Sequence, residues 1–144
     1  MTWRLIPRII IGLASVALLI CATGLKAEER SRWLSAAVNA QGMRYRGSEY
    51  PGGGPWMDDA IKTVAPNYPY EARSRHIYGS GVFRITLDLN TGSVTKVTVI
   101  TSTRFPILDN SATDALRQWR WKPGRWKEID VPITFTMTGS SRQR

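Results

Sequence analysis

Hydrophobic and polar residues alternate along two stretches of the chain, and a run of β-branched residues lies between them. Each of the three predicts a β-strand. Val82 to Leu89 places an apolar residue at every second position from Phe83, which is the period of a half-buried strand. Asn90-Thr91-Gly92 then predicts a hairpin turn, and Val94 to Thr101, β-branched almost throughout, predicts the returning strand. Ile129 to Met137 alternates in the same way and predicts a third strand.

Two further stretches have the signals of helices. Pro66 to Arg73 predicts a helix with Pro69 in its first turn and Gly79 as its stop. After Pro106, either Asp109 or Asn110 can cap a second helix. One apolar stripe at helical spacing would place this helix on the sheet: Leu108, Ala112, Leu116 and Trp119. The predicted fold class is therefore α+β, with two helices packed on one face of a three-stranded antiparallel sheet, in the order helix-strand-strand-helix-strand.

The first part of the chain predicts an N-terminal signal or anchor helix and a linker before this domain. Ile9 to Leu25 has no charge and follows Arg4 and Arg8, which is typical of a secretory signal peptide and also near the lower limit for an uncleaved membrane anchor. Both interpretations place the domain in the periplasm, anchored to the inner membrane by residues 9–25 or secreted after cleavage. We divide the chain into a signal or anchor (1–27), a linker (28–63) with a Pro-Gly run at 51–55, a domain (64–138) and a tail (139–144).

Pro132 predicts the position of the last strand in the sheet. A proline inside a strand cannot donate to a neighbour on its N–H side, so such strands are found at sheet edges. We therefore expect Ile129 to Thr136 to be an edge strand with one side of its main chain unpaired. An unpaired edge can bind an extended peptide by strand addition.

Composition and charge limit the chemistry. The formal net charge is +9, and residues 64–144 carry twelve bases and six acids, which favours an acidic partner. The chain has one cysteine, Cys21, and one histidine, His76, so it has neither the ligands of a typical zinc site nor an internal disulfide. We find no set of residues for nucleophilic catalysis, and predict that the protein is not an enzyme and binds no cofactor or metal.

Several short motifs, taken in order, resemble the TonB C-terminal domain family over residues 64 to 137. They begin with Tyr68-Pro69 and Ala72, Gly79 before a strand, Gly92 in a turn, and Val97-x-Val99. They continue with Leu108-Asp109, Ala112, Ala115, Arg117-x-Trp119-Arg120-Trp121-x-Pro123, and Val131-Pro132-Ile133-x-Phe135.

This resemblance implies the same fold and a function. Members of the family are periplasmic energy transducers or adaptors that support transmembrane transport, and pair their last strand with a segment of an outer-membrane transporter. A proton-driven motor complex in the inner membrane supplies the energy. Carried over by position, the partner-binding residues lie in the last strand and in the segment before the first helix: Ile129, Asp130, Val131, Pro132, Ile133, Thr134 and Thr136, with Pro66, Tyr68 and Pro69.

Two other functions stay open at the level of sequence. The chain has no long spacer rich in proline and lysine, and no histidine in its apolar run, which favours a periplasmic scaffold or dimerisation module uncoupled from any motor. Five bases between Arg117 and Lys127, with tryptophans among them, could bind single-stranded nucleic acid. An exported protein meets little nucleic acid, so we place this alternative last.

Overall fold

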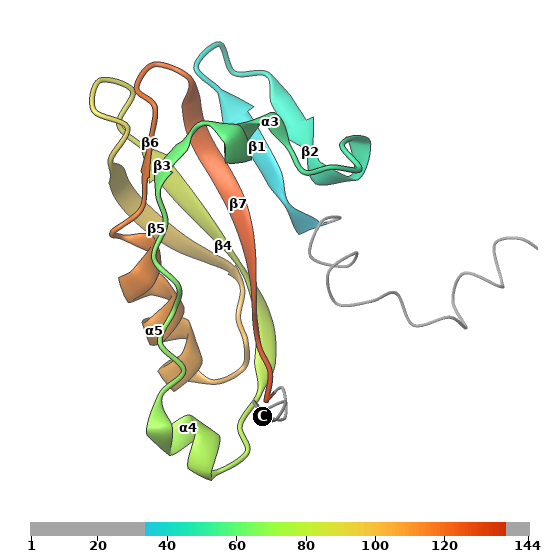
Figure 1. Cartoon of the computed structure of the whole chain (residues 1–144), viewed down its shortest axis with the longest axis vertical. Helices are drawn as coiled ribbons and strands as arrows, with labels where there is room; N and C mark the ends of the chain where they lie inside the picture. Colours follow the sequence, from blue (N-terminus) through green and yellow to red (C-terminus); the bar gives the residue numbers. More distant parts are fainter. Residues whose placement is uncertain (1–33, 138–144) are drawn as a thin grey trace, which may run out of the picture.

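The computed structural model describes residues 34–137, and its three longest strands are the three that the sequence predicts. β4 spans Gly79–Leu87, β5 spans Val94–Thr101 and β7 spans Trp126–Phe135. β4 lies between the other two and pairs antiparallel with both (Figure 1). The three predicted strands are therefore confirmed, with β4 and β7 beginning three residues earlier than expected.

Gly92 makes the turn between β4 and β5 possible. Its φ is +70°, and a Cβ at this position would lie 1.8 Å from the carbonyl oxygen of Trp121. The Trp121 amide in turn donates to the Gly92 carbonyl at 2.9 Å. Only glycine allows this close approach, which ties the turn to the chain that follows the long helix.

The long helix α5 spans Pro106–Leu116 and packs on one face of the sheet (Figure 1). Three residues of the predicted stripe are fully buried there: Leu108, Ala112 and Leu116. Trp119, the fourth, lies beyond the end of the helix and is only partly buried. The predicted cap was wrong, because Phe105 is the N-cap and Pro106 takes the first helical position.

Asp109 binds the loop before its helix and does not cap the helix itself. Its carboxylate accepts hydrogen bonds from the Thr103 amide at 2.9 Å and the Thr103 hydroxyl at 2.8 Å, and from the Ser102 hydroxyl. Burial alone would raise the pKa of Asp109, but these hydrogen bonds outweigh it and lower the pKa. The carboxylate thus fixes the loop between β5 and α5.

The first predicted helix is present but short. α4 spans Tyr70–Ser74, with Pro69 as its N-cap and Ala72 fully buried. It ends before His76, whose φ is +53°, and Gly79 is the first residue of β4 and not the helix stop. The short length leaves residues 64–69 extended beside α5, where the Trp119 indole donates to the Val64 carbonyl at 2.7 Å.

The sheet has five strands in the order β2-β1-β7-β4-β5, which corrects the predicted three. The two extra strands, β1 (Ala36–Asn39) and β2 (Arg44–Arg46), form a hairpin within the segment predicted to be a linker. Ala37 pairs opposite Ile129 and is 2% exposed, and the Tyr45 ring packs edge-on against Trp126 at 5.4 Å. The hairpin therefore belongs to the sheet because its inner face completes the core.

Residues 47–62 continue across the domain instead of forming a free spacer. They comprise η1 (Gly47–Glu49), α3 (Pro55–Asp58) and β3 (Ala60–Lys62), which pairs with β6 (Arg120–Trp121) in a separate two-stranded sheet. Trp56 of α3 is 1% exposed and belongs to the hydrophobic core. The described part of the predicted linker is thus folded against the domain.

The predicted signal or anchor, residues 1–27, and the tail, 139–144, lie outside the described residues. Within 34–137, each helix is too short or too polar to cross a membrane.

Candidate functional site

The two sides of β7 are not paired to the same extent. On one side, β4 pairs with β7 from Glu128 to Phe135. On the other side, β1 pairs only with the first half of β7, from Trp126 to Asp130. Among the strands within residues 34–137, none pairs with this second side of Val131–Phe135. Within residues 34–137, the main chain of Val131–Phe135 therefore has a neighbouring strand on one side only, which is β4.

This arrangement corrects the predicted edge of Ile129 to Thr136. Ile129 and Asp130 are paired on both sides, because β1 occupies the position next to them. Thr136 lies just beyond the end of β7. Pro132 is two residues past the last pair with β1, where β7 has a neighbour on one side only, so its missing N–H agrees with the open half of the strand.

The side chains of Ile129 and Asp130, the two predicted residues that pair with β1, make their contacts within the domain itself. Ile129 is 1% exposed and belongs to the core. Asp130 is buried on the opposite face of the sheet, where Arg84 binds both of its oxygens at 2.7 and 3.0 Å and Arg44 binds one at 3.1 Å. Hydrogen bonding to Asp130 raises the pKa of Arg84. The main chain of neither Ile129 nor Asp130 is free to pair with an added strand.

The predicted residues in the open half of β7 are partly accessible. Val131, Pro132 and Ile133 are half-buried, while Thr134 and Thr136 are exposed. The Ser80 hydroxyl donates to that of Thr134 at 3.0 Å across the pair with β4. A partner at this edge would therefore bind chiefly through the main chain of Val131–Phe135.

The segment from Pro66 to Pro69 lies beside the end of β7. Its Tyr68 ring contacts the Phe135 ring at 5.5 Å, and the Tyr68 hydroxyl donates to the Ile77 carbonyl at 2.6 Å. Pro66 and Pro69 are half-buried. The structure thus brings Tyr68 to the same strand as the other predicted residues, but as a packing group that holds the strand end.

A groove of about 620 Å³ lies beside the open edge, and sequence analysis did not anticipate it. Its lining includes the loop 51–54 with Met57, which we call the wall, β7 from Ile129 to Pro132, and three tryptophans: Trp56, Trp119 and Trp121. The Pro-Gly run was correctly predicted as a loop. The aromatic residues around this loop were the signal that the loop lies on the domain, because they pack on one another and on Trp126.

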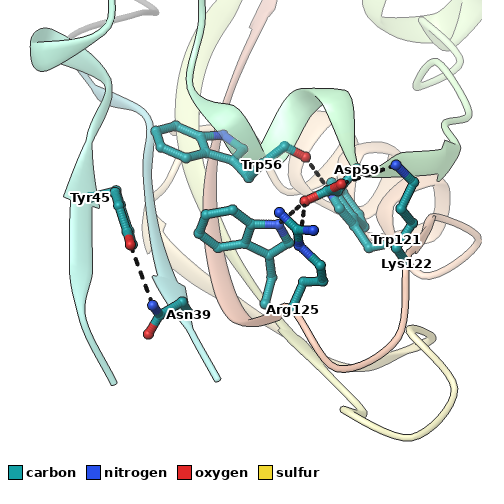
Figure 2. A network of polar contacts seen from close by, with 8 residues as sticks. Asn39, Tyr45, Trp56, Asp59, Trp121, Lys122 and Arg125 are labelled. Atoms are coloured by element: carbon teal, nitrogen blue, oxygen red, sulfur yellow. Dashed lines mark hydrogen bonds and ion pairs between the residues drawn. The ribbon is translucent and has the colours of Figure 1, made fainter. Parts of the chain in front are cut away.

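A network of polar contacts holds this wall in place (Figure 2). Asp59, just after α3, is 5% exposed and accepts a hydrogen bond from the Trp126 indole at 2.9 Å. Lys122 and Arg125 form ion pairs with the same carboxylate at 3.2 and 3.0 Å. The Trp121 indole donates to the Trp56 carbonyl at 2.7 Å. These contacts attach the segment before residue 64 to the chain between α5 and β7.

The charge of Asp59 is stabilised by these neighbours. Burial alone would raise its pKa, but the hydrogen bonds from Trp126 and Lys122 and the charges of Arg125 and Lys122 outweigh this effect. The pKa of Asp59 therefore lies below its ordinary value of 3.8, and the carboxylate is ionised at neutral pH.

The basic cluster between residues 117 and 127 is largely paired within the domain. Lys122 and Arg125 bind Asp59, and Arg117 lies 3.5 Å from Asp114. The indoles of Trp121 and Trp126 are 0% and 5% exposed, so neither offers a face on which a nucleotide base could stack. In the described part of the chain, no group of three or more His, Cys, Asp or Glu side chains is placed to hold a metal ion.

Comparisons with known proteins identify the family of this chain. The family described as "Gram-negative bacterial TonB protein C-terminal" matches residues 64–138. Protein TonB of Vibrio cholerae serotype O1 is 34% identical over an alignment of 82 residues, which covers 53% of this chain and 33% of that protein. The chain therefore spans about a third of the length of this relative. The solution NMR structure of the Pseudomonas aeruginosa TonB C-terminal domain is similar over 58% of this chain and 88% of that chain, with 22% identity and a TM-score of 0.45. The family match covers more than half of the 144 residues of this chain, so the chain belongs to the TonB C-terminal domain family.

Proposed function

We propose that this chain is a TonB-like periplasmic adaptor that binds an extended segment of an outer-membrane transporter by strand addition to Val131–Phe135. The observation that carries this proposal is the open main chain of this half of β7 within an otherwise paired strand. Main-chain groups without a partner strand favour an added strand, because each new pair of strands forms a ladder of hydrogen bonds. Family membership supports a partner in the outer membrane, and the role in transmembrane transport follows from that partner.

Within the described residues, the two outer strands of the sheet, β2 and β5, also have an unpaired edge, so the proposal makes a choice that can be tested. Hydrogen exchange of the full chain in detergent should be measured with and without synthetic segments of outer-membrane receptors. We expect a binding segment to slow exchange of those amides in Val131–Phe135 that point away from β4, with β2 and β5 unchanged. Segments methylated at alternate main-chain nitrogens should lose binding. Protection of β5 alone, or binding by no receptor segment, would contradict strand addition at β7.

Whether the adaptor is energised depends on its N-terminus. In an energised transducer, residues 9–25 stay as an inner-membrane anchor that contacts a proton-driven motor complex. The alternative is a periplasmic scaffold or dimerisation module without a motor, which is favoured by the absence of histidine from residues 9–25. N-terminal sequencing of the mature protein separates the two, because a new terminus close to Leu25 or Glu28 excludes an anchor.

A further inference from the structure

The groove beside β7 suggests what kind of segment the open edge accepts. We propose that the wall formed by residues 51–57 is a selectivity element that receives one apolar side chain from the added strand, whose neighbours in sequence are polar or acidic. This inference rests on the proposed function, because it needs an extended segment paired with Val131–Phe135. It concerns residues that lie before the family match at 64–138.

The position of the groove follows from the alternation of side chains in a strand. Successive side chains of a strand point to opposite faces of the sheet. The groove lies on the face that carries Ile129 and Val131, which is the face covered by α5 and the core. An added strand would therefore direct every second side chain toward the groove and the remaining ones to the open face.

The lining of the groove is suited to an apolar side chain. Met57 is 52% exposed and Trp119 is partly buried, so both offer apolar surface that a ligand can cover. Gly52 and Gly53 leave space, since a Cβ at either position would meet nothing within 4 Å. The one charged residue in the lining, Asp130, is already bound by two arginines. Met57 adds adaptability, because its unbranched side chain fits irregular shapes.

The opposite face of the sheet favours polar or acidic neighbours. Strand pairing places Arg46, Asp130 and Arg84 on this face, and Arg44 reaches Asp130 there. Lys96 of β5 and Glu128 of β7 share the face through their pairs with Thr86. Four bases against two acids leave this face positive, so an acidic side chain on either side of the apolar one would be attracted to it.

The segment 51–57 is rigid enough to act as a wall. Trp56 is anchored in the core, and Asp59 is held by Trp126 and two bases, as described above. A Cβ at Gly54 would lie 2.1 Å from the Trp56 ring, so the backbone of the loop rests directly on the indole. A wall fixed in this way can discriminate between side chains, because it does not move away from a poor fit.

The test uses peptides that differ only in their central residue, with the full chain in detergent as the protein. The central residue is Leu, Gly or Asp, and acidic or polar residues flank it at alternate positions. Dissociation constants are measured by fluorescence anisotropy, and amide protection is measured by hydrogen exchange. We expect the Leu peptide to bind about tenfold or more tighter than the Gly peptide, and the Asp peptide to bind weakest.

Variants of two exposed methionines provide the matched comparison. M57E places a charge in the groove and should remove the preference for Leu. M43E changes a methionine that is similarly exposed, 56% against 52%, but lies in the turn between β1 and β2, so it should keep the preference. Circular dichroism confirms that both variants fold.

The outcomes separate this inference from the proposed function. If all peptides protect Val131–Phe135 but bind equally, or if M57E keeps the preference for Leu, the selectivity wall is refuted and strand addition stands. If no peptide binds, both fail. If Val131–Phe135 becomes protected without peptide as the protein concentration rises, a second copy of the chain occupies the edge. The proposed role of the groove in selecting a peptide side chain is then refuted.

Discussion

Replacement of Trp56 by alanine tests whether the segment before residue 64 is part of the folded domain. Trp56 is 1% exposed, although it lies outside the region matched by the family. Its ring makes edge-on contacts with Tyr50 and Trp126, each at 6.1 Å between ring centres. If this segment were a flexible linker, as the local sequence predicts, the substitution would leave the free energy of unfolding unchanged.

The destabilisation expected for W56A follows from the full burial of the Trp56 ring. Truncation of a fully buried Trp or Phe to Ala costs about 3–5 kcal/mol, as the sum of lost burial and the cavity left behind. Natural domains have a free energy of unfolding of about 5–15 kcal/mol, so W56A should remove a large part of the stability. The hydrogen bond from the Trp121 indole to the carbonyl of residue 56 uses the main chain, and an alanine keeps it. We therefore expect a loss near the lower end of the range.

Urea denaturation of the full chain in detergent, followed by circular dichroism, measures this loss. With a slope of about 1–3 kcal/mol per molar urea, the midpoint should fall by about 1–3 M. The control is M57A at the next position, which is half exposed and should change the free energy of unfolding by less than about 0.5 kcal/mol. A loss below about 1 kcal/mol for W56A would show that this segment is not anchored, and would remove the physical basis for the groove.

Three further predictions concern the same region. D59N should lower the free energy of unfolding at pH 7 by about 2–3 kcal/mol, because a buried charged acceptor with three donors is lost. Since the folded-state pKa of Asp59 is lowered, its contribution is present above about pH 4 and disappears as the pH falls through that pKa, so wild type and D59N should converge in acid unfolding experiments. G54A should destabilise the chain by about 1–3 kcal/mol in thermal or urea melts, since its Cβ would overlap the Trp56 ring, whereas G52A should leave stability nearly unchanged or slightly raised. D130N should cost about 1.5–3 kcal/mol through weaker bonds to its two arginines, and its unfolding should show no change in the slope with urea.

The hairpin of β1 and β2 decides how much of β7 a partner can reach. Because β1 covers Trp126 to Asp130, an added strand can pair with at most five residues, Val131–Phe135, unless the hairpin moves. Ala37 and the Tyr45 ring pack into the core, so displacing the hairpin would expose apolar surface. The short edge and the groove beside it act on the same segment of a partner, one through its main chain and the other through a side chain.

Local patterns were sufficient for the central part of the fold. The alternation from Val82 to Leu89 and the β-branched run from Val94 to Thr101 placed two strands, and the spacing of Leu108, Ala112 and Leu116 placed the helix that covers them. These signals succeed because burial on one face imposes a fixed period on the sequence of a strand or helix, whatever the element pairs with. The family motifs were found in the same stretch, and the family match confirms them.

Only the tertiary structure decided which part of β7 is open. Four residues, Ala36–Asn39, carry no readable period, and their partners at Trp126–Asp130 lie about ninety positions later in the chain. Trp56 likewise appears in sequence as one aromatic residue after a Pro-Gly run, and becomes core because Tyr50, Trp121 and Trp126 converge on it. The sequence by itself determined that β7 has an exposed edge, through Pro132. The length of that edge, and the wall beside it, depend on contacts that exist only after distant segments have packed together.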